Sequence, residues 1–269
     1  MNREREVLAL DFDGVISDSA LETFVVAVRT YGKLAGPGGH HPAWAEIEKA
    51  DSQAILSHPT YQEFLGLMPL GNRAEEFAVA LAVIEAGVSV EEQVDFDRFR
   101  EGLGAEFLAN FHAAFYRERS AFRRADPHAW LALVAPFDEF VELLRRRAGD
   151  RIFALATAKD RASIDLLLGA YGVADLFPDR LVVDKEAGRS KRAHLALLRE
   201  RLDVAFEQIT FVDDKLNHLE DVAPLGVRCA LSGWGYNGQR ERNAAVERGF
   251  PVLDLAGAEA VLFGNPGEH

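Results

Sequence analysis

The chain has 269 residues, of which 48% are hydrophobic and 27% are charged, a balance that supports a buried core and excludes a disordered chain. It carries 43 Asp and Glu against 30 Lys and Arg, and the resulting net charge of −13 argues against binding to nucleic acid or to an anionic membrane. Cys229 is the only cysteine, which excludes an intrachain disulfide and a thiolate metal cluster.

The sequence also argues against a membrane segment or a signal peptide. No apolar run approaches the roughly 18 residues that span a bilayer. The first apolar run, Val7–Leu10, is followed at once by Asp11 and Asp13, which a signal peptide would not carry. We therefore expect a soluble, cytoplasmic protein. The oligomeric state is left open, and a homodimer is compatible with the sequence.

A long helical region is expected after the first strand. No convincing strand is found from Ser19 to about Asp126, although Gly36–Gly39 and Ala125–Pro127 interrupt the helical pattern. Apolar residues recur every fourth position and predict one stripe on a long helix, which packs in a core: Phe99, Leu103, Phe107, Phe111 and Phe115. We interpret residues 19–130 as a helical domain inserted after the first strand.

Strands and helices alternate from about residue 150 to the C-terminus. The expected strands are Val7–Leu10, Ile152–Ala156, Ile209–Val212 and Val227–Leu231, with weaker candidates at Leu181–Val183 and Pro251–Leu253. The expected helices are Asp138–Arg147, Arg161–Tyr171, Lys191–Leu202, Leu216–Ala223 and Gln239–Arg248. Continuous apolar strands between helices predict an α/β core with a doubly wound, Rossmann-like parallel sheet, formed by residues 1–18 and 131–269.

Two pairs of carboxylates follow predicted strands. Asp11 and Asp13 come directly after the first strand, and side chains at positions i and i+2 of an extended chain point to the same side until Gly14 turns it. Asp213 and Asp214 follow the strand Ile209–Val212, although one of them could instead cap the next helix. Neighbouring parallel strands would bring all four carboxylates into one crevice, where a hard cation such as Mg²⁺ is implied.

Two further positions suggest an anion site. Thr157 follows the strand Ile152–Ala156 and precedes a helix, where a hydroxyl and free backbone N–H groups can bind an anion or simply cap the helix. Lys191 opens the next helix, where a positive charge opposes the helix dipole unless an anionic partner is present. Each signal alone is also compatible with an ordinary helix start.

Together these features, in this order, resemble the haloacid dehalogenase-like superfamily of hydrolases. The first motif of that family resembles Asp11-Phe12-Asp13-Gly14-Val15, the second Thr157, the third a lysine before a helix, and the fourth Asp213-Asp214. The resemblance covers nearly the whole chain. A helical cap directly after the first motif is similar to that of the phosphoglycolate-phosphatase-like and phosphomutase-like members.

The resemblance implies an aspartyl-phosphate mechanism on a small phosphorylated metabolite. Asp11 would be the nucleophile and Asp13 the general acid and base. Mg²⁺ would be held by Asp11, the Asp13 backbone carbonyl and Asp214, with or without Asp213. Thr157, the backbone N–H of Ala158 and Lys191 would bind the phosphate.

Some positions stay open. Lys185 is an alternative to Lys191, because neither is followed by the proline that the family often has there. Many members have an acid four residues after the metal-binding Asp, and this position is His218 counted from Asp214 or Asn217 counted from Asp213. His218 is also a candidate for a hydrogen bond to a metal ligand. Arg73 is the cap residue chosen for a substrate contact, and the segment Gly233–Tyr236 resembles a loop of phosphoglycolate-phosphatase-like members.

The expected activity is Mg²⁺-dependent hydrolysis of a small phosphomonoester. Asp13 argues against dehalogenation, because dehalogenases of the family lack this second carboxylate. Two alternatives remain: a phosphomutase acting on a sugar phosphate, and a non-catalytic binding protein with the same fold.

Overall fold

The computed structural model describes residues 6–264 apart from 36–41, 49, 72 and 189. The chain divides into two compact units, one formed by Met1–Asp18 with Pro136–His269 and the other by Ser19–Ala135. We call them the core unit and the helical unit. The helical unit extends slightly beyond the expected limit at residue 130, because a further helix follows the break at Ala125–Pro127. The break expected at Gly36–Gly39 lies outside the described residues.

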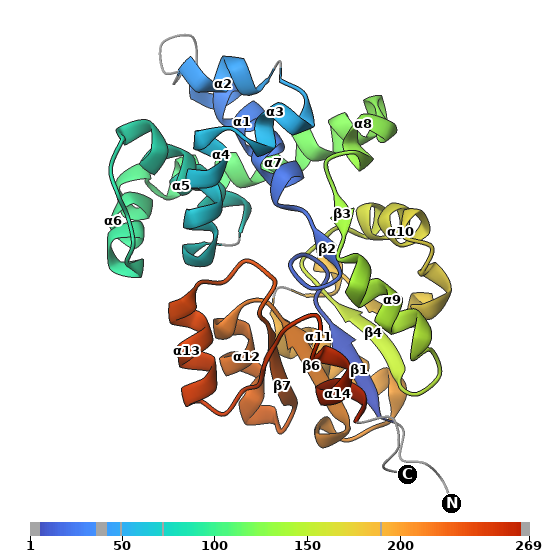
Figure 1. Ribbon diagram of the computed structural model, residues 1–269. Coiled ribbons are helices and arrows are strands. Elements are labelled where there is room, and N and C mark those ends of the chain that lie inside the picture. The colour runs from blue at the N-terminus through green and yellow to red at the C-terminus, as the bar shows by residue number, and fades with distance from the viewer. Residues whose placement is uncertain (1–5, 36–41, 49, 72, 189, 265–269) are drawn as a thin grey trace, which may run out of the picture. The chain divides into compact units, whose positions relative to one another are not determined.

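The core unit contains a parallel sheet of six strands in the order β5-β4-β1-β6-β7-β8 (Figure 1). Its strands are β1 (Val7–Leu10), β4 (Ile152–Ala156), β5 (Val182–Val183), β6 (Ile209–Asp213), β7 (Arg228–Ser232) and β8 (Val252–Leu253). Leu10 pairs with Leu155 of β4 and with Val212 of β6, so the carboxyl ends of these three strands meet at one edge. The predicted fold class, a Rossmann-like sheet with an inserted helical unit, is confirmed.

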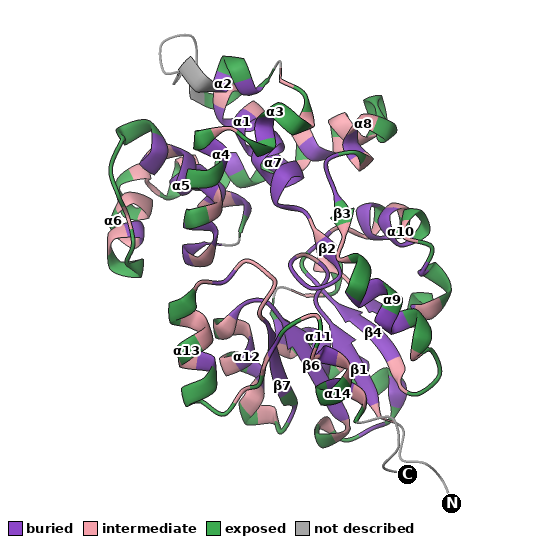
Figure 2. Ribbon diagram, viewed as in Figure 1, coloured by how far each residue is buried: buried purple, intermediate pink, exposed green. Residues whose placement is uncertain are grey.

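Helices bury both faces of this sheet. They are α9 (Asp138–Arg146), α10 (Arg161–Ala170), α11 (Lys191–Leu202), α12 (Leu216–Val222), α13 (Gln239–Glu247) and α14 (Ala258–Phe263). Leu195 of α11 and Leu219 of α12 share a core cluster with Val7 of β1. On β4, the ring of Phe153 packs edge-on against Phe263 of α14. Figure 2 shows the strands buried along most of their length, which explains their continuous apolarity.

The described part of the helical unit consists of helices, with no strand before its last residue. They are α1 (Ala20–Ala35), α2 (Pro42–Ile47), α3 (Ser52–Leu56), α4 (Pro59–Leu67), α5 (Ala74–Ala86), α6 (Gln93–Leu103), α7 (Ala105–Ala125) and α8 (Pro127–Leu131). Two short strands that the sequence did not reveal, β2 (Ser17–Asp18) and β3 (Ala135–Pro136), pair where the chain leaves and re-enters the core unit. No described helix is both long and apolar enough to cross a membrane.

The prediction of one long helix carrying Phe99 to Phe115 is wrong. The chain breaks at Gly104, whose φ of +78° ends α6 and precedes α7. A left-handed backbone favours glycine and cannot continue a right-handed helix. The apolar stripe is therefore divided between two helices, and its most buried members, Phe111 and Phe115, both lie on α7.

A buried ion pair holds the helical unit together. Glu22 of α1 accepts hydrogen bonds from Arg119 Nε at 2.8 Å and Nη2 at 2.7 Å, and from Trp130 Nε1 at 2.9 Å. We expect Arg119→Ala to destabilise the protein by about 3–5 kcal/mol, because it leaves the fully buried Glu22 carboxylate without a cation. Urea denaturation, with the exposed Arg124→Ala as control, measures the loss. Equal midpoints for both variants would contradict the prediction.

Candidate active site

Asp11 lies at the carboxyl end of the central strand. Its backbone N–H still pairs with Val212 O at 2.9 Å, while its Oδ1 accepts the Phe12 N–H at 2.7 Å. The chain turns at Gly14, whose φ is +77°. Asp11 is buried with only 8% of its surface exposed, whereas Asp13 is partly exposed. The Asp11 carboxylate is thus fixed at the carboxyl end of the sheet, whereas the Asp13 carboxylate can reach a molecule in solution.

Lys191 joins the two acidic strand ends. Its Nζ lies 2.8 Å from Asp11 Oδ2 and 3.1 Å from Asp213 Oδ2, and it donates to Ala156 O at 2.8 Å. It is the first residue of α11, which Ser190 caps by accepting the Ala193 N–H at 3.2 Å. The two carboxylates supply the anionic partner that a lysine at a helix start requires.

The side chain of Lys185, the alternative, has a different partner, although its backbone N–H donates to Lys159 O at 3.4 Å. It belongs to a short 3₁₀ turn, Lys185–Ala187, and its Nζ is 3.7 Å from Glu186. Its side chain is 29% exposed, against 5% for Lys191. The geometry therefore favours Lys191 as the lysine of the site.

The charged groups in this cluster shift one another's pKa values. Burial lowers the pKa of Lys191, but Asp11 and Asp213 outweigh it and hold that pKa above its ordinary value. Burial and the nearby Asp213 raise the pKa of Asp11, although Lys191 opposes them. The pKa of Asp213 is lowered against its burial by His218 and Lys191. The lysine stays charged, and Asp213 stays ionised beside it.

The two residues of the Asp213-Asp214 pair have different partners. Asp213 Oδ1 accepts the Lys215 N–H at 2.8 Å, and both its oxygens lie 3.1 Å from His218 Nδ1. Asp214 Oδ2 accepts one hydrogen bond, from the Tyr236 N–H at 2.9 Å, and no other donor to this carboxylate is found among the described residues. Burial raises the pKa of Asp214 to about 7, and the nearby Asp213 and Asp11 add to the rise while the charge of Lys215 opposes it. Asp213 is therefore satisfied by protein groups, whereas among the described residues no cation lies within ion-pair distance of the buried Asp214 carboxylate.

Thr157 and Ala158 leave donors available at the end of β4. Thr157 Oγ1 accepts the Lys159 N–H at 3.2 Å, so its hydroxyl proton can still be donated. Ala158 is exposed, and within the described part of the chain its N–H has no acceptor. A hydroxyl and an N–H side by side at a strand end are suited to two oxygens of an anion.

Lys159 was not identified from the sequence. Its side chain is fully buried, its Nζ lies 2.8 Å from Asp13 Oδ1, and its ammonium lies 5.8 Å from the centre of the Phe12 ring. It thus ties the strand end of Thr157 to that of Asp13. The chain bends at Ala158 and Lys159 after β4 ends, so no strand periodicity pointed to Lys159, and the sequence does not reveal its burial.

Acidic residues at this edge fit a divalent cation. Donor atoms of Asp11, Asp213 and His218 lie within 4.8 Å of one another. The ammonium of Lys191 already lies between Asp11 and Asp213, whereas Asp214 has no ion-pair contact among the described residues. The oxygen donors of Asp11 and Asp214 are the type that hard cations prefer.

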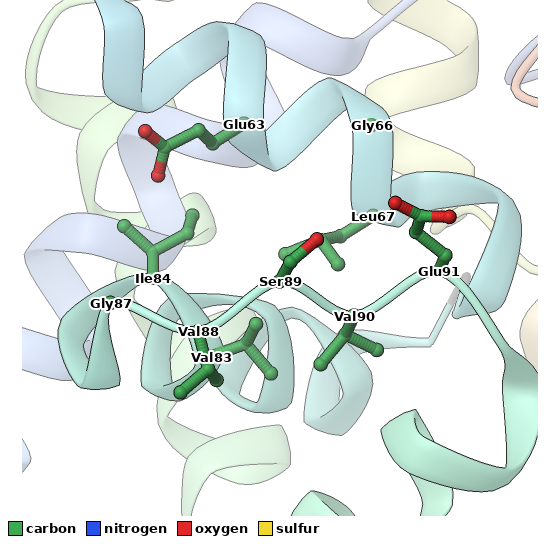
Figure 3. Close-up of a pocket in the computed structure, with 10 residues that line it drawn as sticks. All are labelled: Glu63, Gly66, Leu67, Val83, Ile84, Gly87, Val88, Ser89, Val90 and Glu91. Carbon is green, nitrogen blue, oxygen red and sulfur yellow. The ribbon is translucent and has the colours of Figure 1, made fainter.

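A separate pocket of about 490 Å³ lies within the helical unit (Figure 3). Aliphatic side chains such as Leu67, Val83 and Ile84 line it, with the carboxylates of Glu63 and Glu91 toward opposite ends. None of its ten lining residues is basic, so it is not suited to a phosphate. Arg73, the cap residue chosen from the sequence, does not line it; it precedes α5, and its N–H donates to Glu76 Oε2 at 2.9 Å.

Comparison with solved structures finds the same fold in several phosphatases. Predicted phosphoglycolate phosphatases from Lactobacillus delbrueckii and Haemophilus somnus are 14% and 17% identical to this chain, with TM-scores of 0.65 and 0.59, and each match covers 97% of this chain and 100% of the other. A haloacid dehalogenase family hydrolase from Deinococcus radiodurans, solved with bound phosphate and sodium, is 16% identical with a TM-score of 0.52 over 97% of this chain and 96% of that one. At such identities the likeness concerns the fold.

Sequence comparison assigns the family. No curated protein matches the chain. The profile of the haloacid dehalogenase-like hydrolases, however, matches residues 6–220, which include both acidic pairs, Thr157 and Lys191. The match confirms the resemblance seen in the sequence, and the chain belongs to the haloacid dehalogenase-like hydrolase family.

Proposed function

We propose that this hydrolase is a Mg²⁺-dependent phosphatase that cleaves a small phosphomonoester through a phosphoaspartate on Asp11. The observation that carries the proposal is the buried Asp11 carboxylate, which lies 2.8 Å from the Lys191 ammonium at the sheet edge. The Asp13 carboxyl follows two residues later. Phosphatase neighbours with the same fold support this choice over other hydrolytic chemistry.

In the first step Asp11 attacks the phosphorus atom. A bond forms between a carboxylate oxygen of Asp11 and phosphorus, while the bond from phosphorus to the ester oxygen breaks. Asp13 gives its proton to that leaving oxygen, and its partial exposure lets it reach the leaving group. Lys191 holds Asp11 in place and offsets the negative charge of the phosphate.

In the second step water attacks the phosphorus of the phosphoaspartate. Asp13, now a carboxylate, takes a proton from that water, and the bond from phosphorus to Asp11 breaks to release inorganic phosphate. The Thr157 hydroxyl and the Ala158 N–H bind the phosphate oxygens in both steps, because these donors are otherwise available. Lys159 holds the Asp13 carboxyl at the site through its 2.8 Å contact.

The residues that would hold the Mg²⁺ are Asp11, the backbone carbonyl of Asp13 and Asp214. When bound, the ion supplies positive charge that shields the Asp11 carboxylate from the incoming phosphate. We prefer Asp214 to Asp213 as the direct ligand, because Asp213 is already satisfied by Lys191, His218 and the Lys215 N–H.

The proposal is tested by measuring phosphate release from a broad panel of phosphomonoesters with Mg²⁺. We expect at least one substrate with a kcat/KM of about 10⁴ M⁻¹s⁻¹ or more. A sugar phosphate whose phosphoryl group moves to another hydroxyl without release would indicate a phosphomutase instead. If no compound of the panel shows phosphate release or phosphoryl transfer, the proposal is contradicted.

Removal of the metal gives a second prediction. We expect EDTA to stop phosphate release and added Mg²⁺ to restore it, because the ion would shield the Asp11 and Asp214 carboxylates from the phosphate. The measurement is the initial rate before and after chelation, with buffer exchange alone as the control. A rate that is indifferent to EDTA would show that the reaction needs no exchangeable metal.

A further inference from the structure

The loop after β7, residues 233–237, holds Asp214 from two directions. The Tyr236 N–H donates to Asp214 Oδ2 at 2.9 Å. The Asn237 side-chain amide donates to Asp214 O at 3.0 Å and to Ser232 O at 2.8 Å. Asn237 is only 7% exposed, so these bonds are shielded from water. Both the carboxylate and the backbone carbonyl of Asp214 are thus fixed by this one loop.

Gly235 lets the loop approach the site this closely. A Cβ at this position would lie 2.3 Å from Asp214 Cβ and 2.5 Å from Gly14 O, so no side chain fits without displacing one of them. The loop therefore packs directly on the turn that follows β1 and on the residue that follows β6. This close packing explains a glycine at this position.

The same loop is also fastened to the chain that follows Asp13. The Tyr236 hydroxyl donates to Asp18 Oδ1 at 2.9 Å, and the Trp234 ring N–H donates to Val15 O at 3.1 Å. The carbonyl of Tyr236 accepts a hydrogen bond from Lys215 Nζ at 2.7 Å. Tyr236 consequently connects Asp214 and Lys215, which directly follow β6, with Asp18 of β2.

We propose that Gly235, Tyr236 and Asn237 are positioning residues that hold Asp214 for the divalent cation, and that the Tyr236–Asp18 hydrogen bond links this cation site to β2. The inference rests on the proposed function, in which Asp214 is a metal ligand. Groups that orient a metal ligand commonly change affinity by about 10–100-fold when they are lost. Asp214 needs such support because, within the part of the chain that the structure describes, the Tyr236 N–H is the one hydrogen-bond donor to its carboxylate.

The first test measures Mg²⁺ binding by calorimetry without substrate, in the wild type, Gly235→Ala and Gly169→Ala. We expect Gly235→Ala to raise the Kd for Mg²⁺ by about tenfold or more. Gly169→Ala is the control, because Gly169 lies within α10 and a Cβ there would meet nothing within 4 Å. A Kd for Gly235→Ala equal to that of the control would overturn the proposal.

The second test isolates the phenol and applies even if Gly235→Ala does not fold. Tyr236→Phe removes only the hydroxyl, and Asp18→Ala removes its acceptor. We expect each substitution to raise the Kd for Mg²⁺ several-fold. The Kd of the double variant should not exceed that of the weaker-binding single variant, because the two substitutions remove the same hydrogen bond. Asp18→Asn, which keeps an oxygen acceptor, should retain most of the affinity. An unchanged Kd in Tyr236→Phe, or fully additive effects, would refute the link to Asp18.

Different results would refute the metal site and the positioning role. If the wild type itself takes up no Mg²⁺, the metal of the proposed function is wrong and the inference falls with it. If the wild type binds Mg²⁺ and releases phosphate while Gly235→Ala and Tyr236→Phe bind Mg²⁺ equally well, the positioning role alone is refuted.

Discussion

Replacing Asp11 by Asn is expected to lower kcat by roughly 10⁴-fold or more, because the amide cannot form a covalent bond to phosphorus. The change preserves the shape of a side chain that is 8% exposed, and Asn can still accept the Phe12 N–H. We therefore expect the fold to remain intact by circular dichroism. The measurement is the rate of phosphate release with the best substrate of the panel.

Asp175→Asn is the matched control for that variant, since Asp175 is an exposed residue of the 3₁₀ turn Ala174–Leu176, which follows α10. It should retain the activity of the wild type. Residual activity of Asp11→Asn within about tenfold of wild type would exclude Asp11 as the nucleophile, because the loss of a covalent nucleophile costs far more.

Lys191→Ala is expected to lower kcat/KM by about 10²–10³-fold, the effect of removing a group that stabilises charge in the transition state. The variant leaves the Asp11 and Asp213 carboxylates without the ammonium that now lies 2.8 Å and 3.1 Å from them. It also removes the donor to Ala156 O, so some loss of stability should accompany the loss of rate. Steady-state kinetics below the melting temperature separate the two effects.

Lys185→Ala is the control for the choice between the two lysines. Because Lys185 is near Glu186 and 29% exposed, we expect its loss to change kcat/KM by less than about twofold, within the range of an exposed ion pair. A strong effect of Lys185→Ala beside a weak effect of Lys191→Ala would transfer phosphate binding to Lys185.

The sequence predicted the sheet because its central strands are apolar on both faces. The runs at Val7–Leu10 and Ile152–Ala156 are continuous for this reason, and both form strands as expected. The strand-end residues Asp11 and Asp213 followed from the same reasoning, since parallel strands place their carboxyl ends together. Gly104 was overlooked because the fourfold spacing of phenylalanines continues across it, although its backbone ends one helix and begins another.

The contacts that distinguish one site residue from another could not be predicted. Asp213 and Asp214 are adjacent in sequence, and only the fold shows that one faces Lys191 and His218 while the other faces the Tyr236 N–H. Lys159 is similar, since its partner Asp13 is distant in the chain. Such pairs depend on which loops meet at the carboxyl ends of the strands. The periodicity of a single sequence does not indicate which loops these are.

The central claim is that a phosphoryl group is transferred to Asp11. It is tested most directly by mixing excess enzyme and Mg²⁺ with the fastest substrate of the panel, quenching in acid within the first turnover, and mapping the modified peptide by mass spectrometry. We expect one phosphoryl group on Asp11. It should be labile to alkali and absent from the Asp11→Asn variant. Phosphate release with no phosphorylated protein at any quench time, or a phosphoryl group on another residue, would contradict it.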